Sequence, residues 1–74
     1  MNTLKVIAAA KALNRVTMGY NSDLGRKRLI EAGLSGDVSK ADQLVAELER
    51  VSEREGFRIG GIEARKALAA LNES

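Results

Sequence analysis

Residues 37–56, DVSKADQLVAELERVSEREG, decide the fold because they carry every signal of one complete amphipathic helix. Asp37 or Ser39 can accept a hydrogen bond from a free backbone N–H at the start, and Gly56 suits the backbone turn that follows a helix. The apolar residues between them recur three and four positions apart, on one helical face: Ala41, Leu44, Val45, Leu48 and Val51. We therefore predict a helix over 38–55.

A first helix is predicted over residues 3–19, where Asn2 or Thr3 can cap the start. This segment is apolar around most of its circumference, so the helix has to be covered on several sides. Three other short helices of one chain do not offer that much surface. We therefore expect self-association, with the interface made by Leu4, Ile7, Leu13 and Val16.

A second, shorter helix is predicted over residues 23–33. Gly33 is expected to end it, because glycine readily takes the left-handed conformation found just beyond many helices. Gly25, inside it, weakens the helix but leaves room for its backbone to pack closely on the first helix.

The last helix is predicted over residues 62–72, after a short connector, FRIGG, at 57–61. Phe57 is expected to fold back on Val51, as the hydrophobic contact that often accompanies a glycine-terminated helix. Together the four segments predict an all-α single domain, residues 1–74. Its architecture would be a small bundle of three to four short helices, completed by self-association.

The composition narrows the available chemistry. The chain has 74 residues, no cysteine and no histidine, which excludes disulfides and Cys/His metal sites. A chain this short buries little apolar surface, so its core gives only marginal stability, and oligomerisation is the remaining way to add to that stability. No cofactor is expected. The apolar run VIAAAKAL, residues 6–13, is too short to span a bilayer and has no signal-peptide pattern. We therefore expect no membrane partner and a cytoplasmic location.

The net charge of +2 conceals an uneven distribution along the chain. Residues 1–34 carry six basic and two acidic residues, whereas residues 37–56 carry three basic and six acidic ones. These opposite charges can pair within one chain, or between copies, where they would set the orientation of an oligomer. Solvated helix faces with little energetic effect are the plainer interpretation.

The stretch MGYNSDLGRKR, residues 18–28, is the candidate binding site. Free N–H groups at a helix start favour an anion, and a tyrosine can stack on a base. The residues expected to contact an anion, a nucleic acid or a partner are Tyr20, Ser22, Arg26, Lys27 and Arg28. Asp23 would repel an anion, and consecutive helical residues point about 100° apart. The favoured interpretation is therefore a solvated basic helix start that pairs with the acidic helix.

The stretch RKRLIEAGLSGDVSKADQLV, residues 26–45, has the outline of a DNA-binding helix-turn-helix. Leu29 occupies a place where that motif usually has a small residue, and Ser39 the place of a buried aliphatic one. The second helix is net negative and would face phosphates. An ordinary helical hairpin is favoured over this motif.

No catalytic set is expected, because the usual nucleophile–base pairs need histidine or cysteine. We therefore expect a non-enzymatic protein that binds a protein target, as a regulator, adaptor or inhibitor, and that forms a homo-oligomer. Chains of this length are common among accessory proteins of phages and mobile elements, and such a source is expected on length alone. One alternative is a nucleic-acid-binding regulator with a degenerate helix-turn-helix. Another is an oligomer that binds or sequesters a nucleotide or other anionic ligand at the start of helix 23–33.

Overall fold

The computed structural model describes residues 3–17 and 24–73, and this part of the chain is helical without strands. Its elements are α1 (Thr3–Thr17), α2 (Leu24–Leu34), a 3-10 turn η1 (Val38–Lys40), α3 (Ala41–Glu55) and α4 (Ile59–Asn72). The predicted all-α bundle is confirmed. None of the described helices is long and apolar enough to cross a membrane.

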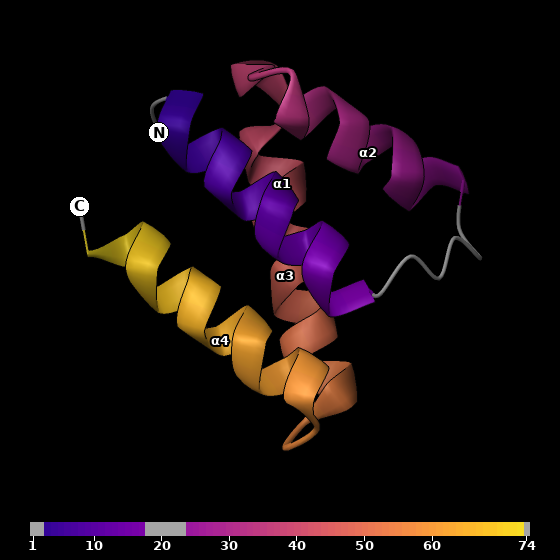
Figure 1. Ribbon diagram of the computed structural model, residues 1–74, viewed down its shortest axis with the longest axis vertical. Coiled ribbons are helices and arrows are strands. Elements are labelled where there is room, and N and C mark those ends of the chain that lie inside the picture. Colours follow the sequence, from indigo (N-terminus) through magenta and orange to yellow (C-terminus); the bar gives the residue numbers. More distant parts are fainter. Residues whose placement is uncertain (1–2, 18–23, 74) are drawn as a thin grey trace.

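The helices form a flat bundle, with extents of 29 × 29 × 15 Å. α1 and α4 lie side by side and antiparallel on one face, and α3 crosses behind both of them (Figure 1). α2 packs against the other flank of α1 and against α3. α1 and α3 each contact all three other helices, so the bundle is built around this pair.

The core lies where α1 meets α3. Leu13 of α1 and Leu44 and Leu48 of α3 are fully buried, and Ile30 and Ala64 join them from α2 and α4. Burial of such aliphatic side chains is the main favourable contribution to folding. The apolar faces of α1 are thus largely covered within a single chain.

The end of α2 differs from the prediction. Gly33 is buried inside the helix, where a Cβ atom would lie 2.5 Å from Leu44 Cδ1 and 2.7 Å from Ala10 Cβ. Gly36, at φ +85°, ends the helix instead. Its N–H donates to the Gly33 carbonyl at 2.9 Å, and that of Asp37 donates to the Ala32 carbonyl at 3.0 Å, as in a Schellman motif. The close-packing role expected of Gly25, which is exposed, belongs to Gly33.

Both predicted ends of the acidic helix are confirmed. The N–H of Ser39 donates to Asp37 Oδ1 at 3.1 Å, which caps η1 directly before α3. The Ser39 hydroxyl donates to the same oxygen and lowers the pKa of Asp37 below its ordinary value of 3.8. Gly56, at φ +56°, follows the last residue of α3 and its N–H donates to the Ser52 carbonyl.

The connector after α3 is shorter than predicted, because α4 begins at Ile59 and includes both glycines of FRIGG. A Cβ atom at Gly61 would lie 2.4 Å from the Gly56 carbonyl oxygen, so this glycine permits a close approach of two backbones. Phe57 does not cover Val51. Its side chain is 89% exposed, and the guanidinium carbon of Arg65 lies 5.5 Å from its ring centroid.

Candidate partner-binding surface

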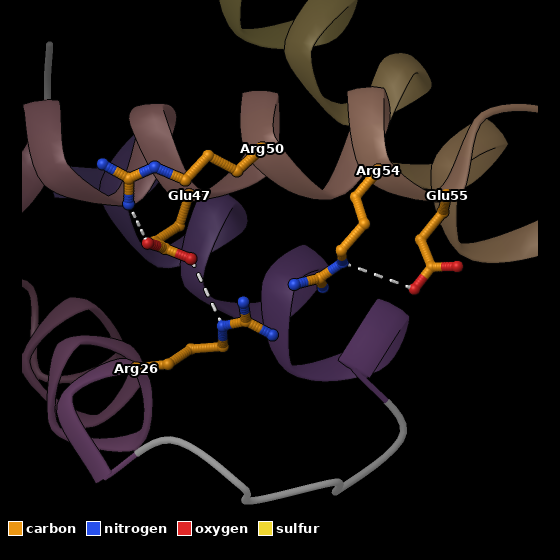
Figure 2. Close-up of polar contacts among 5 residues, drawn as sticks. All are labelled: Arg26, Glu47, Arg50, Arg54 and Glu55. Carbon is orange, nitrogen blue, oxygen red and sulfur yellow. Dashed lines mark hydrogen bonds and ion pairs between the residues drawn. The ribbon is translucent and has the colours of Figure 1, made fainter.

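The predicted anion site is only partly described by the structure. Tyr20 and Ser22 lie outside the described residues. Arg26 projects from α2 toward α3, where its Nε lies 3.2 Å from Glu47 Oε2 (Figure 2). The two side chains are 14% and 13% exposed, and Glu47 also pairs with Arg50 of its own helix. Arg26 therefore helps to hold α2 against α3.

The other two cations of this stretch point elsewhere, as their spacing predicts. Lys27 and Arg28 are both exposed on α2. Arg28 borders a shallow hollow of about 130 Å³, which also has Lys40 and Gln43 at its edge. The three consecutive cations thus do not converge on one ligand.

The helix-turn-helix alternative would place α3, which is net negative, against DNA. The exposed residues of α3 include three carboxylates, Asp42, Glu49 and Glu53. These carboxylates would meet phosphates if α3 entered a DNA groove, and like charges repel. Within the described residues, no three acidic side chains come together as a metal site.

The four residues predicted to form an oligomer interface have different surroundings. Leu13 is fully buried inside the single chain, so it has no surface left for a second copy. Ile7 and Val16 are half-buried, and Leu4 is 77% exposed. A Leu13→Glu variant would accordingly unfold the chain whatever its oligomeric state. The predicted interface reduces to Leu4, Ile7 and Val16.

Leu4 belongs to a groove that runs between α1 and α4. Its first hollow has a volume of about 480 Å³ and is lined mainly by alanines. The α1 wall is Leu4, Lys5, Ala8, Ala9, Ala12 and Arg15, and the α4 wall is Ala67, Ala70 and Leu71. Small side chains on two facing helices leave this space unfilled. Its volume is in the range of about 300–1,000 Å³ that is common for binding pockets.

A second hollow, also of about 480 Å³, continues the groove toward the start of α4. It is lined by Arg15 and Val16 of α1 and by Ile59, Gly60 and Glu63 of α4. Arg15 borders both hollows, so they are neighbours along the antiparallel pair. Ile59, at 81% exposed, stands at the far end of this α1/α4 groove, as Leu4 does at the near end.

The groove has a basic rim. Lys5 and Arg15 of α1 line it, and the sequence of α1 contains no aspartate or glutamate. On α4, Glu63 Oε1 lies 3.7 Å from Lys66 Nζ, so its charge is partly neutralised. The surface is therefore apolar along its floor and positive along its α1 side.

Sequence reasoning missed the groove, because its walls come from opposite ends of the chain. The alanines of α1 and α4 signal helix formation in the sequence, and only the antiparallel pairing brings them together. Exposed leucine and isoleucine at the two ends were the available signal.

Comparison with family models, with curated proteins and with solved structures gives no match to this chain.

Proposed function

We propose that this protein acts by binding another polypeptide in the α1/α4 groove, as a non-enzymatic regulator, adaptor or inhibitor in the cytoplasm. One observation carries the proposal: two neighbouring and mainly apolar hollows of about 480 Å³ each lie between α1 and α4. Exposed apolar surface with polar edges is typical of sites that bind proteins.

The residues at the groove suit a polypeptide better than a small polar ligand. Alanines line the first hollow, and the aliphatic side chains of Leu4 and Ile59 lie at the two ends of the groove. Such a surface gives binding free energy by removing apolar area from water, at about 25 cal/mol per Å². The charged side chains among the lining residues are Lys5, Arg15 and Glu63.

Self-association through the surface residues Leu4, Ile7 and Val16 of α1 stays a prediction. The exposed apolar surface of α1 that would favour it is smaller than the sequence suggests, because α2, α3 and α4 already cover most of this helix. Sedimentation of the purified chain over a range of concentrations would measure the oligomeric state.

The test uses two matched variants of α4, Ala70→Gln and Ala69→Gln. Both residues are exposed on the same helix, but Ala70 lines the first hollow and Ala69 lines neither. The tagged wild type and both variants would capture proteins from the source cell's lysate at high salt, with quantitative mass spectrometry of the eluates. We expect a stoichiometric protein that Ala70→Gln loses and Ala69→Gln keeps. Equal capture by both variants would remove the groove from the proposal.

A nucleic-acid-binding regulator is the second candidate, and the exposed cations of α1 favour it. Lys11 and Arg15 lie on a helix without carboxylates. Binding of this kind weakens steeply with salt, because bound phosphates release counterions. Capture repeated at low salt, from lysate with and without nuclease treatment, followed by the absorbance of the eluates at 260 nm, separates it from protein binding. A nucleotide at the start of α2 would instead raise the melting temperature of the pure protein.

A further inference from the structure

We propose that the occupant of the α1/α4 groove is an amphipathic helix of another polypeptide, with acidic residues flanking its apolar stripe. This inference rests on the proposed function, because it names the chemistry of the partner that the groove would bind. Shape, wall chemistry and charge each support it.

The shape of the groove matches a helix. Two antiparallel helices leave between them a furrow into which a third helix can lay its apolar face, with anchors at i, i+3 or i+4, and i+7. The two hollows lie in series along this furrow and share Arg15. α1 has 15 residues, so at 1.5 Å per residue it is about 22 Å long. An occupant helix of about four turns would span the groove.

The walls allow a helix to come close. Ala8 and Ala70 are exposed on opposite sides of the first hollow, and neither has a side chain long enough to hold a neighbouring backbone away. Gly60 has the same effect in the second hollow. Leu4 and Ile59 then offer aliphatic contacts to the two ends of the occupant's apolar stripe.

The positive charge along the α1 side of the groove favours an occupant helix with acidic residues beside its apolar stripe. Lys5 and Arg15 line the first hollow from α1. Within the described part of the chain, the guanidinium of Arg15 forms no ion pair, and the residue is exposed. Carboxylates beside an apolar stripe would meet these two cations at the α1 side of the groove. A contact between two copies through this surface would bring two basic rims into one interface, which the repulsion of like charges disfavours.

The inference is tested with labelled helical peptides of about eighteen residues. The first has a leucine stripe with glutamate on both flanks, the second has lysine in place of every glutamate, and the third has the first peptide's composition without a stripe. Fluorescence anisotropy would measure their affinities for the wild-type protein. We expect the first peptide to bind at least about tenfold more tightly than either of the others.

Two double variants of equal charge show whether the rim itself attracts the peptide. Lys5→Gln with Arg15→Gln removes the two cations that line the first hollow. Lys27→Gln with Arg28→Gln removes two exposed cations of α2. We expect the first pair to weaken binding of the acidic peptide about tenfold and the second pair to weaken it less than about threefold. Equal losses would indicate attraction to the overall net charge and would overturn the inference.

The remaining outcomes separate this inference from the proposed function. Equal binding of the glutamate and lysine peptides would show that apolar contact alone selects the partner, which overturns the acidic occupant. If neither peptide binds while capture from lysate still depends on Ala70, the acidic helix is wrong and the proposed function stands. If both tests fail, both proposals fail. A dimer that Ala70→Gln dissociates would assign the groove to a second copy and overturn the acidic occupant.

Discussion

Replacing Gly33 with alanine tests how tightly α2 packs on the core. A Cβ atom at this position would lie 2.5 Å from Leu44 Cδ1 and 2.7 Å from Ala10 Cβ. Both neighbours are fully buried, and the Cβ of Ala10 has no torsion that could move it away from the new methyl group. The methyl group can therefore be accommodated only if α2 shifts away from α1 and α3.

The expected magnitude is the difference of two opposing effects. Alanine is favoured over glycine inside a helix by about 1 kcal/mol. Inserting a methylene-sized group into a packed core costs about 1–3 kcal/mol, and two contacts below 3.0 Å place Gly33 at the upper end. We expect Gly33→Ala to lower the free energy of unfolding by about 2 kcal/mol. In a domain of this size that loss lowers the melting temperature by about 10 °C.

The assay is thermal and urea unfolding followed by circular dichroism, with Gly25→Ala as the matched control. Gly25 lies in the same helix and is exposed, so the propensity effect acts there without the core clash, and we expect stabilisation of up to about 1 kcal/mol. If Gly33→Ala stabilised the protein as much as Gly25→Ala does, the close packing of α2 on Leu44 and Ala10 would be refuted.

Three further substitutions test other contacts of the bundle by the same unfolding measurements. Gly61→Ala should destabilise the protein by about 3 kcal/mol, because its Cβ would lie 2.4 Å from the Gly56 carbonyl oxygen. In the control Gly60→Ala, the Cβ would lie 3.3 Å from the Val16 carbonyl oxygen, so the loss of stability should be much smaller. Equal losses for the two variants would contradict the close approach of the backbones at Gly61. A double-mutant cycle on Arg26→Ala and Glu47→Ala should give a coupling of about 1 kcal/mol, and additive losses would show that their ion pair contributes nothing. Asp37→Ala should lower the urea midpoint near neutral pH. Because the folded pKa of Asp37 lies below 3.8, the carboxylate's contribution is present above that pH and is lost as the pH falls through the folded pKa, so wild type and variant should converge in strong acid.

Local signals made α3 predictable from the sequence. Its cap at Asp37, its apolar spacing and its terminal Gly56 all lie within a few residues of the features that they determine. The fold class followed in the same way, because each helix has its own periodicity. Self-association was predicted from the wide apolar face of α1. Much of that face is alanine, whose small side chain has little surface to bury, and neighbouring helices of the same chain already bury Ala9, Ala10 and Ala12.

The glycines show why the rest could not be predicted. Glycine either adopts a positive φ, as at Gly36, or lets another part of the chain approach the backbone closely, as at Gly33 and Gly61. The second use depends on atoms distant in the sequence, here those of Ala10 and Leu44 for Gly33, which no local pattern reveals. The groove is long-range in the same sense, because it exists only where α1 meets α4.

The pairing of the first helix with the last has a thermodynamic consequence. The two walls of the groove belong to Thr3–Thr17 and Ile59–Asn72, so the binding surface is absent from the unfolded chain. An occupant that contacts both walls binds the folded state alone and shifts the folding equilibrium by mass action, by about 2.7 kcal/mol at one hundred times its Kd. Because a small bundle has a small core, a bound partner would thus also stabilise the pairing of α1 with α4.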